Sequence, residues 1–298
     1  MTSSFPVVGF VGSGPIARLL IAPTIDLGVD LLKFMPTSNL NDLRDFACKC
    51  DVILHEEGAL AVSTIRTLEE EGFDFRPSSK IVVFAHELNA KFAEVHASDS
   101  DTRLSLLVAR SPHNQCSVWS PSQLQGPQMQ DNSLFSVTPP PHLPQSESAK
   151  AQELALELAR EIGLVGVMHV EMSLHDDVLV ITHIDAHLNL AGNWTIDGSR
   201  TSQFEQHLRG VLDLPLGDPR MSSGFAVSAT FHVGTSENMY RPYLHLMARS
   251  PVLKFHQYRP DGGKRTPQGH VTAVGNDLVD LRQCVTHAID FMSGAINE

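Results

Sequence analysis

Short apolar runs and segments of helical spacing alternate along the first 84 residues. The run FPVVGFVG (residues 5–12) is β-branched and aromatic and stops at glycine, which predicts a buried parallel strand. Residues 14–27 then carry helical spacing through Ile16, Leu19 and Leu20. Further strands are predicted at 29–34, 51–55 and near Phe73, and further helices at 40–48 and 60–71. This alternation predicts a doubly wound α/β unit.

The pattern changes after residue 104. The segments LSLLVAR, CSVWSP and LFSVTP predict antiparallel strands that end at three prolines, residues 139–141. An amphipathic helix follows over 149–162, and then a hairpin of VGVMHVEMSL and VLVITHIDAHL around a turn at 175–177. A helix over 202–212 precedes a β-rich tail to 275 and a final helix, whereas the Gln-, Pro- and Ser-rich stretch 120–130 is expected to be a loop.

Composition narrows the class of protein. A chain of 298 residues with 42% apolar side chains can bury a full core, and no apolar run is long enough to span a bilayer or resembles a secretory signal. Four scattered cysteines are too few for a disulfide framework, so reduced thiols and a cytoplasmic location are expected. A net charge of -12 disfavours nucleic acid and leaves a small molecule as the expected partner.

The turn Gly12-Ser13-Gly14-Pro15-Ile16-Ala17 fits the pattern G-x-G-x-x-G/A, in which glycines let backbone amides approach a phosphate. A nicotinamide dinucleotide would also require an acidic residue at the end of the second strand, where Met35 and Pro36 stand instead. The turn is therefore expected to fit helix to sheet or to face another ligand.

Polar side chains gather on the predicted hairpin. His183, Asp185 and His187 alternate, which places them on one face, and Glu171 lies nearly opposite on the partner strand. Such a set could bind a transition metal or, through Glu171 and Asp185, magnesium on a nucleotide. A solvated face of an antiparallel sheet is the alternative, and the sequence leaves all three open.

Two later segments could meet an anion. Ser202 and Glu205 form an S-x-x-E capping box, and the first turn of that helix has free amides, although capping alone explains both residues. The loop from Tyr258 to Arg265 is basic in an otherwise acidic chain, so Lys264 and Arg265 either contact a phosphate or belong to a solvated turn.

A long segment carries a family resemblance. Residues 192–218, GNWTIDGSRTSQFEQHLRGVLDLPLGD, resemble the corresponding run of 5-(carboxyamino)imidazole ribonucleotide synthases, which are ATP-grasp enzymes of purine biosynthesis. Weaker matches fall in the same order along most of the chain, at residues 12–20, 76–77, 91, 104–110, 165–171 and 269–271.

The resemblance implies a fold and a reaction. In this family a mobile lid and a core sheet hold ATP, two carboxylates on neighbouring strands hold magnesium, and activated bicarbonate is passed to the amine of aminoimidazole ribonucleotide. The implied domains are a Rossmann-like unit (1–91), an ATP-grasp core (92–217) and a small β-rich domain (218–298). The implied site residues are Gly12, Gly14, Lys91 and Glu171 for the nucleotide, Asn193, Trp194, Lys264 and Arg265 for the substrate, and Glu171, His183 and Asp185 for the metal.

This chain departs from the family pattern at decisive positions. The lid would lie between Lys91 and Leu104, yet only 12 residues separate them, against the roughly 50 that an independent module needs. His183 stands where the family has its second magnesium carboxylate, and Asn189 and Asn193 stand where histidine is usual.

These departures predict a lidless homologue that is impaired or non-catalytic and binds a nucleotide or ribonucleotide, with ATP and magnesium as its cofactors if it has any. One alternative is an active ATP- and magnesium-dependent synthase. The other is a metal-binding protein that uses His183, Asp185, His187 and Glu171. The resemblance also implies a homodimer.

Overall fold

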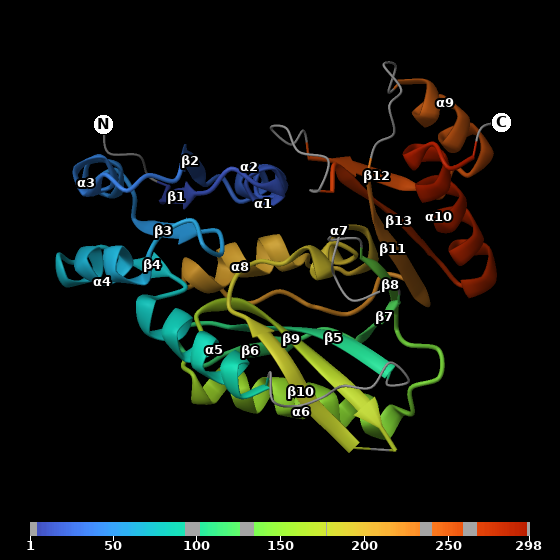
Figure 1. The fold of residues 1–298 in the computed structure, drawn as a ribbon, viewed down its shortest axis with the longest axis horizontal. Coiled ribbons are helices and arrows are strands. Elements are labelled where there is room, and N and C mark those ends of the chain that lie inside the picture. Colours follow the sequence, from blue (N-terminus) through green and yellow to red (C-terminus); the bar gives the residue numbers. More distant parts are fainter. Residues whose placement is uncertain are drawn as a thin grey trace.

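A computed structural model describes residues 5–92, 102–125, 134–176, 178–232, 240–258 and 267–296. The described strands form two sheets, one of four strands in the first 76 residues and one of nine strands in the rest of the chain. Figure 1 shows the smaller sheet and its helices above the β9–β10 hairpin (Gly166–His175 and Val178–Asp185), and the C-terminal strands and helices to one side.

The smaller sheet is parallel, in the order β2-β1-β3-β4, which confirms the predicted doubly wound unit. Its strands are β1 (Val7–Val11), β2 (Asp30–Phe34), β3 (Val52–His55) and β4 (Phe75–Arg76), and its helices are α1 (Pro15–Leu19), α2 (Ile21–Asp26), α3 (Leu40–Ala47) and α4 (Val62–Glu70). The single helix expected over 14–27 is wrong, since α1 and α2 meet at Leu20. Pro23 has no N–H to donate to the carbonyl of Leu19, which explains the break.

Helix α5 (Ser79–Phe92) was not predicted from the sequence, and it protects the edge of the larger sheet. Its Ile81 and Ala85 are buried in the same core cluster as residues of β5 (Thr102–Arg110) and β9. The Asn89 amide donates to the carbonyl of Ile184 at 2.8 Å and accepts from the N–H of the same residue at 2.9 Å. Edge strand β10 thus has backbone groups paired by a side chain of α5.

The larger sheet has the order β10-β9-β5-β7-β8-β11-β13-β12, with β6 paired to β5. Its remaining strands are β6 (Cys116–Val118), β7 (Ser122–Gln125), β8 (Phe135–Thr138), β11 (Phe225–Phe231), β12 (Lys254–Gln257) and β13 (Gly269–Gly275). The loop expected over 120–130 is wrong at 122–125, because β7 is paired with β5 on one side and β8 on the other. The sheet also continues across the expected domain boundary at 217–218.

In this part of the chain the sequence predicted α6, α8 and α10, whereas η1, α7 and α9 were not predicted. These elements are α6 (Gln145–Glu161), the 3-10 turn η1 (Leu190–Gly192), α7 (Thr195–Gly198), α8 (Gln203–Val211), α9 (Tyr240–Arg249) and α10 (Leu278–Ser293). Helix α6 starts four residues earlier than expected, directly after Pro144. Ser202 caps α8 by accepting the N–H of Glu205 at 3.2 Å, as the capping box predicted.

One apolar cluster joins the two sheets. It contains Phe10 of β1, Leu107 of β5, Phe204 of α8 and Trp194, which directly precedes α7, all of them buried. Because close-packed side chains hold both sheets in one core, the space between the sheets has fixed walls. In the part of the chain that the structure describes, no helix is long and apolar enough to cross a membrane.

Candidate functional site

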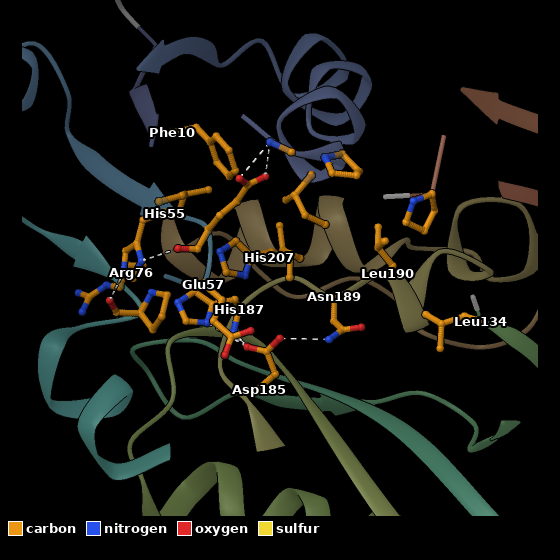
Figure 2. Close-up of a pocket in the computed structure, with 18 of the residues that line it drawn as sticks. Phe10, His55, Glu57, Arg76, Leu134, Asp185, His187, Asn189, Leu190 and His207 are labelled. Atoms are coloured by element: carbon orange, nitrogen blue, oxygen red, sulfur yellow. Dashed lines mark hydrogen bonds and ion pairs between the residues drawn. The ribbon is translucent and has the colours of Figure 1, made fainter. Parts of the chain in front are cut away.

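A cleft of about 450 Å³ lies where the carboxyl ends of β1 and β3 face the β9–β10 hairpin and the segment after it. Ligand sites of doubly wound sheets lie at such strand ends, and the volume lies within the usual range for a small-molecule site. Figure 2 shows His55 and Arg76 at one end of the cleft and Asp185, His187 and Asn189 along one side. The polar residues of its lining are His55, Glu56, Glu57, Arg76, Glu171, His183, Asp185, His187, Asn189 and His207.

The glycine turn faces a carboxylate of the protein itself. Glu56 follows β3 and accepts hydrogen bonds from the N–H groups of Ser13 and Gly14, each at 3.0 Å. A Cβ atom at Gly12 or Gly14 would lie 2.5–2.6 Å from the Glu56 carboxylate oxygens, so only glycine allows this approach. Glu56 therefore already occupies the amides that the turn would offer to a phosphate.

Asp185 is almost entirely committed to its neighbours. One carboxylate oxygen accepts from the backbone N–H and the ring Nδ1 of His187, both at 2.9 Å, and the other accepts from the Asn189 amide at 3.0 Å. Burial acts to raise the pKa of Asp185, but the hydrogen bonds from His187 and Asn189 outweigh it and hold this pKa below its usual value. The group is thus a buried carboxylate whose charged form is stabilised by donors of the protein itself.

Glu171 is the more available carboxylate. It lies opposite His183 in the hairpin register, as the sequence predicted, and its side chain is 15% exposed. Arg103 of β5 approaches it to 3.5 Å. The residue opposite Glu171 on the hairpin is His183, so this position offers an imidazole and not a second carboxylate.

Among the described residues, the side chains predicted to hold a metal do not form a compact metal site. In the described ranges, the group of three or more ligand side chains whose donor atoms lie within 4.8 Å of one another is Asp197, His256 and His270, outside the cleft lining. Glu171, His183 and Asp185, the three predicted ligands, form no such group. Asp185 already accepts three hydrogen bonds from His187 and Asn189 and forms no compact group with Glu171 and His183, so the residues as they stand do not fit a two-carboxylate magnesium site.

Three histidines meet at the wall of the cleft. The rings of His55 and His187 lie 5.0 Å apart, and His207 accepts the backbone N–H of Val167 through Nδ1 at 3.0 Å. Burial and the neighbouring His187 lower the pKa of His55 to about 4. Burial, with His187 and His55, lowers the pKa of His207 to about 3. His55 and His207 are therefore neutral at physiological pH.

This histidine cluster predicts a pH-dependent stability. The unfolded chain takes up protons at His55 and His207 below a pH of about 6.5, whereas the folded protein does not do so until about pH 4 and pH 3. Stability should be fully present above pH 6.5 and fall below it by about 1.4 kcal/mol per pH unit for each histidine. Urea unfolding at pH 7, 6 and 5 measures the slope.

The matched variant for that experiment is His207→Gln, since glutamine can also accept the N–H of Val167. We expect its stability to depend less steeply on pH than that of the parent, by about one proton between pH 5.5 and 4.5. An identical slope in the two proteins would show that His207 does not stay neutral in the fold.

The other residues predicted for the site lie in several places. Gly14 lines the cleft, Gly12 is buried beside it, and Lys91 is exposed near the end of α5. Asn193 and Trp194 are 2% and 1% exposed and are absent from the cleft lining, so burial does not favour the substrate contact expected of them. Lys264 and Arg265 lie outside the described residues.

Sequence reasoning missed the contribution of β3. His55 is the last residue of the buried strand β3, and Glu56 and Glu57 follow it directly; β3 lies next in the sheet to the strand that carries the glycine turn. Because parallel strands end at the same edge, two acids and a histidine at that point were a usable signal. His207 gave less signal, because it lies in the middle of an amphipathic helix.

A comparison with known protein families matches the part of the chain that contains the hairpin of the cleft. Residues 86–204 match the ATP-grasp domain, a range that runs from α5 through the hairpin to the start of α8. The chain thus has a mixed α/β fold, with a match to the ATP-grasp domain over these residues.

Individual proteins that are similar to this chain point to one kind of enzyme. N5-carboxyaminoimidazole ribonucleotide synthase of Mycobacterium tuberculosis is 36% identical over 203 residues, which are 65% of this chain and 46% of the relative. The crystal structure of the corresponding synthetase from Thermus thermophilus superposes with a TM-score of 0.80 at 18% identity, covering 98% of this chain and 99% of that one. The Aspergillus clavatus synthase, solved with ADP and 5-aminoimidazole ribonucleotide, gives a TM-score of 0.80 at 16% identity and the same coverage.

The chain is similar in sequence and in fold to the N5-carboxyaminoimidazole ribonucleotide synthases, as the sequence resemblance predicted. Its alignments span about half the length of the first curated relatives it matches.

Proposed function

We propose that this protein binds a small nucleotide or ribonucleotide in the cleft and does not carry out the ATP-dependent carboxylation of its relatives at a comparable rate. The observation that carries the proposal is the state of Asp185, whose two carboxylate oxygens already accept from His187 and Asn189. With an imidazole at position 183 and Asp185 hydrogen-bonded to its neighbours, the described residues of the hairpin offer Glu171 no second free carboxylate with which to share a magnesium ion. Loss of one anchoring carboxylate typically costs orders of magnitude in rate.

The charge around the cleft supports the same proposal. In the part of the chain that the structure describes, its charged lining is four carboxylates and one arginine, namely Glu56, Glu57, Glu171, Asp185 and Arg76. A triphosphate brought against these carboxylates would need a bound cation to offset the repulsion. A neutral base with one phosphate or none meets less repulsion, so a nucleoside or monophosphate is the class of ligand that fits best.

The short length of the connection between α5 and β5 supports the proposal that a closing lid is absent. Helix α5 ends at Phe92 and β5 begins at Thr102, so residues 93–101 are all that could cover the phosphates at this point of the chain. Nine residues are far too few for a folded module with its own core. An uncovered triphosphate would remain in contact with water, which weakens every charge interaction that activates it.

Two measurements test this function. Calorimetry with AMP, ADP, ATP plus magnesium, and aminoimidazole ribonucleotide should show binding of a monophosphate at least as tight as binding of magnesium-ATP. A coupled assay with ATP, bicarbonate and aminoimidazole ribonucleotide should show turnover at least 1000-fold below that of a full-length synthase. Turnover near that of the relative, abolished by Glu171→Ala, would overturn the proposal.

The family's own reaction is the second candidate, and one observation favours it. Glu171 is retained, is partly exposed to the cleft and is approached by Arg103. If Asp185 released His187 and Asn189, the pair could hold the metal. The resemblance further leads us to propose that the protein is cytoplasmic and forms a homodimer. Light scattering of the purified protein would test its oligomeric state.

A further inference from the structure

We propose that Asp197, His256 and His270 form a binding site for one divalent transition metal ion, separate from the cleft. Asp197 lies in α7, His256 in β12 and His270 in β13, so three elements from different parts of the chain bring the ligands together. Their donor atoms all lie within 4.8 Å of one another. None of the three residues lines the cleft.

The ligand types select the class of ion. Two imidazoles and one carboxylate suit zinc, iron(II), cobalt(II) or nickel(II), and they disfavour magnesium and calcium, which prefer oxygen donors. Three protein ligands leave open positions for water or a small ligand. A second cavity, of about 470 Å³, is lined by His256 and gives solvent a route to this point.

His270 has one ring nitrogen without a partner. The residue is fully buried, its Nδ1 lies 2.7 Å from the Tyr258 hydroxyl, and its Nε2 has no hydrogen bond with any of the described residues. A buried polar atom left unpaired costs free energy, on the order of 1–3 kcal/mol. An ion at Nε2 would remove that cost.

A hydrogen-bond relay behind His270 can set the required tautomer. The Asn193 amide lies 2.7 Å from the Tyr258 hydroxyl, and within the described ranges the Asn193 Oδ1 has no partner. With this amide turned over, Tyr258 donates to Asn193 and accepts from Nδ1–H of His270, so Nε2 presents a lone pair. Metal-bound histidines are usually oriented in this way through their second nitrogen.

The other two ligands already lie next to each other. His256 Nε2 and Asp197 Oδ2 are 2.8 Å apart, a separation that two adjacent ligands of one ion can have. The rings of His256 and His270 are 4.5 Å apart and 14° from parallel, so His256 has to turn for an ion to lie in both ring planes. Its side chain is 26% exposed, which leaves room for that rotation.

Cobalt(II) titration of the metal-free full chain tests the site. We expect one Co²⁺ per chain with visible absorption typical of mixed nitrogen and oxygen ligands, and displacement of Co²⁺ by one equivalent of Zn²⁺. Asp197→Asn and His256→Gln should each raise the Kd for Co²⁺ at least tenfold, and Tyr258→Phe about tenfold through the lost orientation of His270. Circular dichroism confirms that each variant is folded.

The chain offers a matched control. His113 Nδ1 and Asp213 Oδ1 lie the same 2.8 Å apart, but the two residues belong to no group of three potential ligands in the described part of the chain. His113→Gln should therefore leave the Kd for Co²⁺ unchanged. Absence of stoichiometric binding, or equal loss of affinity in His113→Gln and His256→Gln, would overturn the proposal and leave Asp197–His256 as an ion pair only.

Discussion

Replacement of Trp194 by alanine is expected to lower the free energy of unfolding by about 3–5 kcal/mol, which is a large part of the total stability of a typical domain. Trp194 is 1% exposed and belongs to the core cluster that includes Phe204, Leu208 and Ala226. Removal of its indole leaves a cavity at the junction of the two sheets. Urea unfolding followed by circular dichroism measures the loss.

The control for Trp194 is Leu244→Ala. Leu244 is 55% exposed on α9, so its truncation should change stability by no more than about 0.5 kcal/mol. The family resemblance instead assigns Trp194 to the substrate. If Trp194→Ala kept full stability and lost only ligand affinity, that assignment would be right and the packing role would be wrong.

The second large effect concerns Glu56. Replacement of Glu56 by alanine removes the carboxylate that accepts from Ser13 and Gly14, and we expect a loss of about 1–3 kcal/mol in stability. The same change frees two backbone amides at the start of α1 and removes one negative charge from the cleft. Affinity for AMP or inorganic phosphate should therefore increase about tenfold, which calorimetry measures.

Glu57→Ala is the matched control for Glu56→Ala. Glu57 also lines the cleft and has the same charge, but the described structure records no hydrogen bond from it to the glycine turn. Its removal should strengthen phosphate binding less than the removal of Glu56 does. Equal gains from the two variants would show that net charge, and not access to the turn amides, limits anion binding.

The two variants also bear on how the family scaffold is used here. The glycine turn has the sequence of an anion site, yet in the folded chain it stabilises the junction of β1, β3 and α1 through Glu56. The hairpin likewise keeps Glu171 and uses Asp185 to order the segment that leads to η1. In both places a group that the family resemblance assigns to ligand binding, the turn amides or the Asp185 carboxylate, is hydrogen-bonded within the protein itself.

The sequence by itself determined the local elements of this protein. Alternation of apolar runs with helical spacing fixed the four parallel strands, and Ser202 with Glu205 fixed the start of α8. The hairpin was predictable because an aspartate tolerates the left-handed turn conformation that Asp176 adopts, with φ at 47°. These features depend on neighbours within a few residues, which a sequence displays directly. The long run after Gly192 added the family.

Only the tertiary structure decided which side chains meet in the cleft. Glu56 reaches a turn more than 40 residues earlier in the chain, and strand β7 exists because β5 and β8 flank it. Asp197, His256 and His270 lie 73 positions apart at their extremes, and no periodicity connects them. Such contacts depend on which strands become neighbours in a sheet, and that choice results from burial of the whole core rather than from any local pattern.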